Sequence, residues 1–296
     1  MSQREKQIER FDAWCEDHGM NFHHGDEGVI PALNAYIKME LEPNYASSSV
    51  KTYSGYIING YGFSAKRIDR PKVSVADVQR GRGDTADRAK QQMADPKYRD
   101  VIESAKHIGF RKDELCHLQG RDLVEYKGHL CVHVIKGKGG KEQYQRILPS
   151  HEQAVRDLFA NKDRKEHLFA KDTKDNVINT HQYRREVAQE AYDYYKGIES
   201  DSEASKGLYK ALLAYWKDMH PKSDYGSHKA YKDAYNRYRE DIFSRGGGEY
   251  RLRGANKERA KELGLPVVYN RLALAAVSAF HLSHWRLDVT VQNYMM

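Results

Sequence analysis

The sequence predicts a mainly α-helical fold with a small antiparallel β-sheet, divided into two domains. Apolar residues recur at helical spacing in both halves of the chain. Residues 129–149 read instead as a strand, a glycine-rich turn and a second strand. The segment 79–88, QRGRGDTADR, is polar, contains glycines and lacks large apolar side chains, which is typical of a linker. We therefore expect a helical domain at 1–85 and a mixed domain at 86–296.

The first domain is expected to consist of helices. One covers residues 5–19, where Gly19 favours termination. A second begins near Pro31, because proline is well tolerated in the first turn of a helix. A third covers 47–63, where serines can cap its start. The apolar faces of the first and third helices are formed by Ile8, Phe11, Trp14 and Cys15, and by Val50, Tyr53, Ile57 and Tyr61.

The second domain is expected to hold helices at 98–110 and 180–195, with a β-hairpin between them. A basic, aromatic insertion follows at about 200–262. Within it, residues 205–262 hold 14 Lys and Arg against 8 Asp and Glu, and so carry most of the net charge of +7. Two sets of residues at helical intervals predict two packed helices there: Leu208, Leu212, Tyr215 and Met219, and Tyr231, Tyr235 and Tyr238. Their outer face suits contact with DNA phosphates or with another protein.

Composition narrows the class of protein. A net charge of +7 and a pI near 9.0 favour an anionic partner such as nucleic acid. The N-terminus has no apolar segment typical of a signal peptide, and the longest apolar run, 272–282, is too short to span a bilayer. The three cysteines do not make a disulfide framework. We therefore expect a cytoplasmic, nucleoid-associated protein with no membrane partner.

Four short segments carry the residues with the clearest chemical potential. They are IGFRKDEL, IKGKGGKEQYQRILP, THQYRRE and LSHWRLDVTVQNY. The third places a histidine and an arginine on one helical face, three residues apart. The last ends in a tyrosine next to the end of the chain. In order, the segments contribute Arg111 and Glu114; Lys138 and Lys141; His181 and Arg184; and His284 and Tyr294.

These residue types match the demands of cutting a phosphodiester with a tyrosine and without a metal ion. The phosphate is already negative and gathers more charge in the transition state, so fixed cationic donors are needed around its oxygens. Arginine suits that task because its planar fork stays charged. An acid must also protonate the leaving oxygen, and the phenol must lose its proton. Lysine suits the acid role, because its pKa falls readily beside other cations.

Together the segments resemble the tyrosine recombinase (phage-type integrase) family. GFRKDELCHLQGRDL is similar to its "tGlRisEl" box, and KGKGGKEQYQRILP to its "GKGgKeR.vPl" hairpin. HQYRREVA is similar to its HxxR box, and LSHWRLDVTVQNYM to its "LGHss…T…Y" box. The order along the chain also agrees. The resemblance covers roughly residues 95–190 and 250–296, and it implies a catalytic domain of this type behind a helical DNA-binding domain.

The resemblance implies that Arg111 and Arg184 clamp the scissile phosphate and that His284 donates a hydrogen bond to a non-bridging oxygen. His281 is a rival for the last role. Without the resemblance, Arg111 reads as an ordinary charge at the end of a helix. His181 and Arg184 then read as a solvated pair on one helical face, and His284 as a core histidine whose hydrogen bonds are satisfied.

It further implies that Tyr294 is the nucleophile and forms a 3′-phosphotyrosine, with His181 accepting or positioning its proton. Lys138 would protonate the leaving 5′ oxygen, with Lys141 as the alternative. No metal ion and no cofactor are implied.

The implied activity is site-specific recombination, integrating or excising a mobile element such as a phage. The implied partners are double-stranded DNA, further copies forming a tetramer on it, and accessory DNA-bending proteins. Two other functions stay open: a catalytically idle, sequence-specific DNA-binding protein, and a type IB topoisomerase-like enzyme that relaxes DNA.

Three features depart from the family pattern. The gap from Arg184 to His284 is far longer than usual, and the insertion accounts for it. Ser283 replaces the usual glycine, and the spacing from His284 to Tyr294 is one residue longer than the commoner one. Only Met295 and Met296 follow the tyrosine, so any exchange of segments between protomers would use another element.

Overall fold

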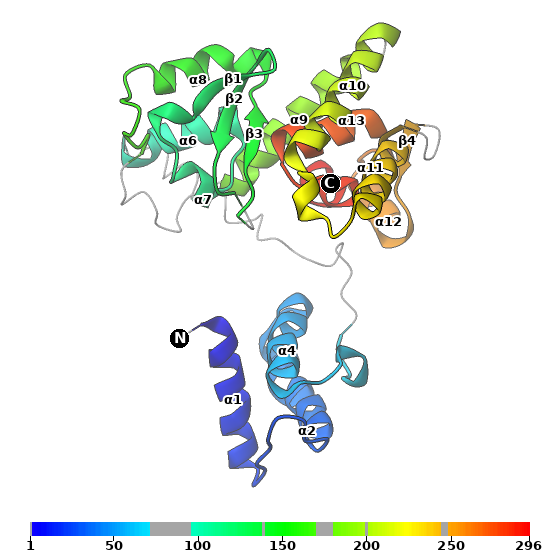
Figure 1. Cartoon of the computed structure of the whole chain (residues 1–296). Helices are drawn as coiled ribbons and strands as arrows, with labels where there is room; N and C mark the ends of the chain where they lie inside the picture. Colours follow the sequence, from blue (N-terminus) through cyan, green and yellow to red (C-terminus); the bar gives the residue numbers. More distant parts are fainter. Residues whose placement is uncertain (1, 72–95, 138–139, 170–179, 199–200, 244–247) are drawn as a thin grey trace. The chain divides into compact units, whose positions relative to one another are not determined.

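The computed structural model describes residues 2–71, 96–137, 140–169, 180–198, 201–243 and 248–296. The chain forms two compact units, Met1–Arg80 and Gly81–Met296. Each is described by itself (Figure 1). The predicted boundary at 85 and the predicted linker at 79–88 lie outside the described residues. The fold is mainly helical with small antiparallel sheets, as the sequence predicts.

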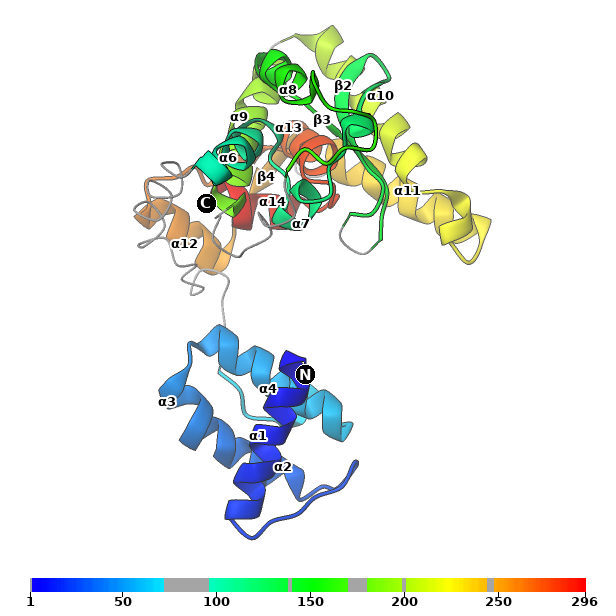
Figure 2. The ribbon, with the colours of Figure 1, turned by 90° about the vertical axis from the view of Figure 1, so that its left-hand side faces the viewer.

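The first unit is built from helices around one core (Figure 2). α1 (Gln3–Asp17) and α4 (Ser47–Tyr61) pack together. α2 (Val29–Tyr36) continues through the π-helical turn η1 (Ile37–Leu41) into α3 (Glu42–Asn44). The short η2 (Ala65–Arg67) follows α4. α2 begins two residues before the expected Pro31, which still falls in its first turn. The core is fully closed to solvent at Phe11, Leu33, Ile37 and Ile57.

The second unit begins with a three-stranded antiparallel sheet. Its strands are β1 (Leu123–Tyr126), β2 (His129–Val134) and β3 (Gln143–Arg146), in the order β1-β2-β3. The sequence indicated β2 and β3 but not β1. The turn before β2 places Lys127 and Gly128 at φ 52° and 75°, the left-handed geometry of a tight hairpin. The remaining short elements nearby are η4 (Gly120–Asp122) and η5 (Pro149–His151).

Helices cover the inner face of this sheet. α6 (Pro96–Ile108) and α8 (Glu152–Phe159) pack together beside it, and α7 (Lys112–Leu115) follows α6. Leu130, Val132 and Val134 are buried in the core they share, as the strand pattern predicts. The opposite face is covered too, because Cys131 is also fully buried.

A second core surrounds α9 (Thr180–Ile198), which packs against α6, α13 and the C-terminal turn. α13 (Arg271–Ala276) runs on into the π-helical turn η9 (Val277–His281), and α14 (Leu287–Thr290) into the π-helical turn η10 (Val291–Met295). Alanines at 273, 275, 276 and 279 are buried in this core, and their small side chains allow close approach of the helices. Tyr294 therefore sits on a turn that packs directly on α9.

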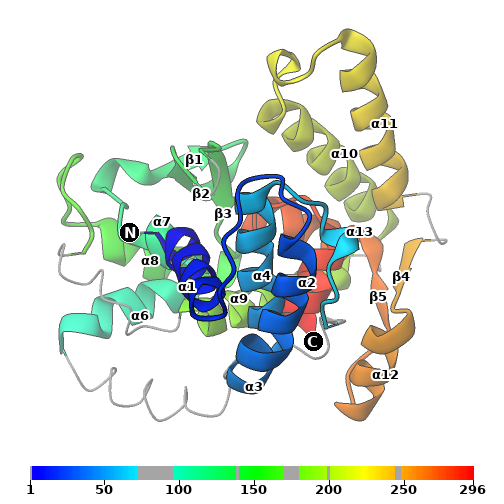
Figure 3. The same cartoon turned by 90° about the horizontal axis from the view of Figure 1, so that it is seen from below.

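The insertion contains the two expected packed helices. α10 (Ser202–Met219) and α11 (His228–Phe243) pack side by side, joined through η7 (Lys222–Asp224) (Figures 1 and 3). β4 (Glu249–Arg251), α12 (Gly254–Glu262) and β5 (Val268–Asn270) follow, and β4 pairs with β5. We call residues 202–243 the insertion hairpin. None of the helices in the described ranges could cross a membrane.

Candidate active site

Arg184, on the first half of α9, joins three segments that are far apart in the sequence. Its side chain is buried, and its Nη1 donates to the Gly109 carbonyl at 2.7 Å. Nη2 donates to the Leu282 carbonyl at 2.7 Å, and Nε donates to the Tyr294 hydroxyl at 3.2 Å. Burial lowers the pKa of Arg184. Arginine starts so high on the pH scale that the group stays cationic at neutral pH.

Arg111 lies beside Arg184 because one buried carboxylate holds both. Arg111 precedes α7, and Glu114 lies within it. The Glu114 Oε1 accepts from Arg111 Nη1 at 2.6 Å, and its Oε2 accepts from the Arg111 backbone N–H at 3.0 Å. Glu114 Oε2 also lies 3.8 Å from Arg184 Nη1. Two guanidinium groups share one carboxylate, so the cluster keeps a net positive charge.

The two arginines differ in their access to a ligand. The Arg111 side chain is 28% exposed, against 2% for Arg184. Arg111 can therefore meet a ligand from solvent, while Arg184 supports the site from beneath. The sequence places Glu114 three residues after Arg111 but gives no sign that it also reaches Arg184.

Tyr294 is enclosed by the other predicted residues. Its side chain is buried, which an incidental C-terminal tyrosine would not require. The His181 ring meets it edge-on, with centroids 5.3 Å apart, and the His284 ring lies nearly parallel at 6.0 Å. The Arg184 guanidinium carbon lies 5.7 Å from the centre of the phenol ring. His181 is itself exposed, so this side of the phenol is close to solvent.

His284 is a neutral hydrogen-bond donor. Burial, followed by the nearby arginine charges, lowers the pKa of His284 to about 3. The Arg286 backbone N–H donates to His284 Nδ1 at 3.4 Å, and the Ser278 hydroxyl lies 3.2 Å from the same nitrogen. A neutral ring that accepts at Nδ1 carries its proton on Nε2. Among the described residues, Nε2 is buried without a hydrogen-bond partner, so its N–H is available to a ligand oxygen.

His281, the rival histidine, belongs to the core. It is 1% exposed, and its Nε2 lies 3.1 Å from the Tyr195 hydroxyl. Burial lowers the pKa of His281 to about 3. The ring therefore already has a polar partner in the core, whereas the His284 ring lies beside Tyr294, which favours His284 as the residue of the site.

The lysine position is described only in part. Lys138 lies outside the described residues. Lys141 is exposed on the same β2–β3 turn, where its carbonyl accepts from the Gly137 N–H at 2.8 Å. The base of this hairpin does reach the site, because Gln143 Nε2 donates to Glu114 Oε1 at 3.5 Å.

The structure thus brings together five of the six predicted residues, drawn from α6–α7, α9 and the C-terminal segment. The result is a tyrosine hydroxyl held by a buried guanidinium, with a second guanidinium, an imidazole N–H and an exposed imidazole around it. Such a site can bind an anionic tetrahedral group and place a phenol against it. In the described part of the chain, no group of three or more His, Cys, Asp or Glu side chains is arranged to hold a metal ion.

Comparisons with known proteins found little similarity to this chain. The sequence matches no protein family profile and no curated protein. Among solved structures, the chain has a likeness to a crystal structure of XerA recombinase, at 13% sequence identity and a TM-score of 0.27. The aligned region covers 80% of this chain and 99% of that one.

Proposed function

We propose that this chain is a tyrosine-type site-specific DNA recombinase. The observation that carries the proposal is the hydrogen bond of 3.2 Å that the buried Arg184 Nε donates to the buried Tyr294 hydroxyl. The rings of His181 and His284 lie beside the same phenol. The phenol belongs to the buried core around α9, so packing and this hydrogen bond together hold it in one place. The same arrangement suits nucleophilic attack on a phosphodiester.

In the proposed reaction the Tyr294 oxygen attacks the scissile phosphorus and its proton passes to His181. Charge that develops on the non-bridging oxygens is met by Arg111, Arg184 and the His284 Nε2–H. The bond from phosphorus to the 5′ oxygen breaks, and that oxygen takes a proton from a lysine of the β2–β3 turn, Lys138 or Lys141. The product is a 3′-phosphotyrosine.

The reverse reaction needs no external energy source. A 5′ hydroxyl of the same or another strand attacks the phosphotyrosine, restoring the phenol and a DNA phosphodiester. Because the number of phosphoester bonds is unchanged, strands can be exchanged without a nucleotide cofactor. We propose double-stranded DNA as the partner, a tetramer as the acting form, and integration or excision of a mobile element as the role.

A covalent-capture experiment tests the activity. The probe is end-labelled duplex DNA from the regions flanking this chain's gene, nicked next to each candidate crossover so that the cut fragment diffuses away. We expect an adduct that survives denaturing gels, forms in EDTA and maps by peptide mass spectrometry to Tyr294. Tyr294→Phe should abolish the adduct, while Tyr269→Phe, another buried tyrosine of the same core, should retain it.

Other outcomes point to the remaining functions. Sequence-specific binding with no adduct on any nicked probe would favour an idle DNA-binding protein. Relaxation of supercoiled DNA by monomers, without sequence preference, would favour a type IB topoisomerase-like enzyme. An adduct that persists in Tyr294→Phe would contradict the assignment of the nucleophile.

A further inference from the structure

The backbone around His284 is strained. Ser283 and Trp285, its two neighbours, have φ of 53° and 57°. This left-handed conformation is unfavourable for a residue with a Cβ, and it persists only where surrounding contacts enforce it. Part of that support is local, since the His284 N–H donates to the Ser278 carbonyl at 3.2 Å.

The remaining support comes from the insertion hairpin through Trp285. The indole contacts Tyr215 of α10 at a centroid distance of 5.3 Å, and Tyr238 of α11 at 5.5 Å. It also meets His220, which follows α10, at 4.9 Å. All three rings belong to the insertion hairpin, and none belongs to the segments that carry the predicted catalytic residues.

The insertion hairpin also bonds to the three-stranded sheet. The Tyr215 hydroxyl donates to the Tyr144 carbonyl at 2.8 Å and accepts from the Tyr144 N–H at 3.2 Å. It thereby satisfies the outer edge of β3 as a neighbouring strand would. On β1, the Tyr126 hydroxyl donates to Asp218 of α10 at 2.6 Å, and Lys127 forms an ion pair with the same carboxylate.

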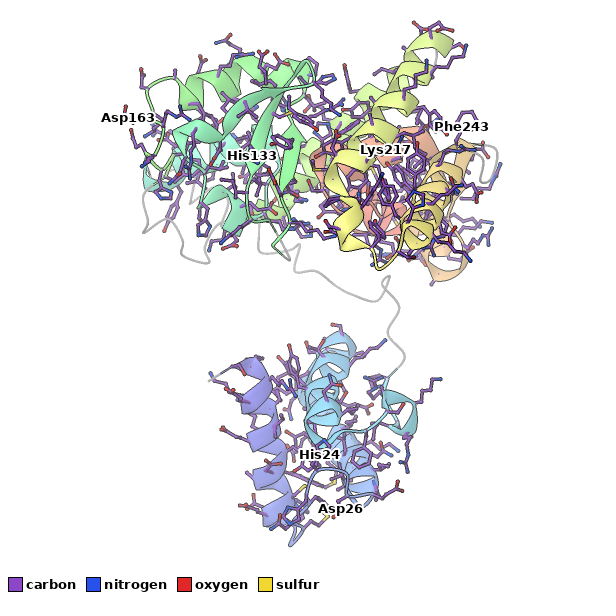
Figure 4. All side chains as sticks on the ribbon, in the orientation of Figure 1. His24, Asp26, His133, Asp163, Lys217 and Phe243 are labelled. Atoms are coloured by element: carbon purple, nitrogen blue, oxygen red, sulfur yellow. The ribbon has the colours of Figure 1, made fainter. Side chains whose placement is uncertain are left out.

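The two helices of the insertion hairpin are joined by aromatic contacts of their own. Trp216, 4% exposed, packs against Tyr231 and Tyr235 of α11, each at 5.5 Å. The Lys217 ammonium lies 4.8 Å from the centre of the Tyr235 ring. Figure 4 labels Lys217 on α10 and His133 on β2, whose ring stacks on that of Tyr144 with centroids 4.4 Å apart. Aromatic contacts thus join α10 to α11 along the pair.

We infer that the insertion hairpin is a clamp that sets the active site, with Trp285 and Tyr215 as its positioning residues. Trp285 holds the strained loop so that His284 faces Tyr294. Tyr215 contacts both the Trp285 ring and the edge of β3, the strand that carries Gln143 and leads from the lysine turn. The clamp therefore fixes the histidine and the lysine hairpin relative to each other. This inference rests on the proposed function for its catalytic meaning.

The first test measures single-turnover formation of the 3′-phosphotyrosine at saturating protein. We expect Trp285→Ala to slow it about ten- to a hundredfold, since a small misplacement of a catalytic group has effects of this size. The DNA dissociation constant should change less than about twofold. The double variant Trp285→Ala/His284→Ala should be no slower than His284→Ala alone, because Trp285 acts through His284. Multiplicative losses, an unchanged rate, or weakened DNA binding at a normal rate would overturn the inference.

Matched tyrosine variants separate the clamp from the general stability of the insertion hairpin. Tyr215→Phe removes only the hydroxyl that caps β3 and should slow cleavage. Tyr225→Phe likewise removes only a hydroxyl, from a ring that contacts Trp216 and Tyr231, and it should leave the rate unchanged. If both variants slow cleavage equally, the insertion hairpin only stabilises the fold, and the clamp is contradicted.

Hydrogen–deuterium exchange tests the clamp without catalysis. Trp285→Ala should speed amide exchange at 283–287, and Tyr215→Phe should speed it at Tyr144, relative to Tyr225→Phe. If the wild-type chain forms no adduct but these amides respond as expected, the clamp stands and the recombinase proposal fails. If an adduct forms and the amides do not respond, the recombinase proposal stands and the clamp fails.

Discussion

At the scale of single residues, Glu114 shows how much of the site depends on one buried group. Its carboxylate contacts both arginines and Gln143, and its side chain is 3% exposed. A buried charge pair contributes little when it is intact, but removing one partner leaves an uncompensated charge. Sequence analysis identified the two arginines because their chemistry is specific. It noted Glu114 three residues after Arg111 but could not show that this carboxylate also reaches Arg184, since an acidic residue early in a helix is common.

Glu114→Gln should lower both stability and activity. It leaves two guanidinium groups without their shared carboxylate, so we expect a loss of about 3 kcal/mol in the free energy of unfolding. Urea denaturation measures that loss, and covalent capture measures the activity. Glu258→Gln is the control, because its ion pair with Lys261 is exposed and should contribute less than about 1 kcal/mol. Equal effects of the two substitutions would contradict the role assigned to Glu114.

Acid should destabilise the second unit through its buried histidines. The pKa values of His281 and His284 fall to about 3 on folding, while that of an unfolded histidine is about 6.5. The unfolded state therefore binds more protons between these values, and stability is lost as the pH falls from 6.5 towards 3. His281→Gln should flatten this part of the stability curve in urea titrations at successive pH values. A curve parallel to that of the wild type would show that His281 does not contribute.

At the scale of elements, the end of α6 matters because the next residues supply the site. Gly109 has φ 67°, and its carbonyl accepts the Arg184 hydrogen bond. A Cβ built there would lie 3.0 Å from Val187 on α9. The glycine therefore allows the chain to turn and α9 to approach at the same point.

Gly109→Ala should reduce covalent capture and lower the melting temperature, because both strain and a clash displace the carbonyl that Arg184 requires. Gly128→Ala provides the comparison. It has a similar φ of 75° but nothing within 4 Å of its Cβ position, so it should cost only about 1–2 kcal/mol of strain and leave activity intact. Matching losses of activity would show that contact with Val187 is immaterial.

The elements also show where sequence patterns were sufficient. Long amphipathic segments such as α1, α9 and α10 were predicted because burial imposes their period on the sequence. β1 was missed because it has four residues, too few for a reliable alternation. The link between Trp285 and Tyr215 could not be predicted at all, since it depends on how two distant segments pack. The four segments that carry the proposed catalytic residues could be singled out because phosphoryl chemistry and the family resemblance restrict their residue types, whatever the fold around them.

At the scale of the whole molecule, the two compact units have separate cores. That of the first unit includes Phe11, Leu33 and Ile57, and its buried members among the described residues all lie between Phe11 and Ile68. A unit of this size can fold alone when its core is well formed.

Residues 1–80 expressed alone should therefore fold cooperatively, with helical circular dichroism and a single urea transition. A chain that lacks residues 1–80 should lose covalent capture, because the family resemblance implies that the first unit binds DNA. A first unit that stays unfolded in isolation would show that its core depends on the rest of the chain.

Tyr294 lies in a π-helical turn, and this turn can explain how the site accommodates a spacing of ten residues from His284 to Tyr294 where nine is commoner in the family. A π turn closes through hydrogen bonds five residues apart, one more than an α turn, so it accommodates one surplus residue within the turn. The Tyr294 side chain can therefore keep its direction although one more residue separates it from His284. Shortening this segment by deleting Gln292 should thus convert the turn to ordinary α geometry and spare the attacking oxygen, whereas lengthening it by one residue should rotate that oxygen out of reach.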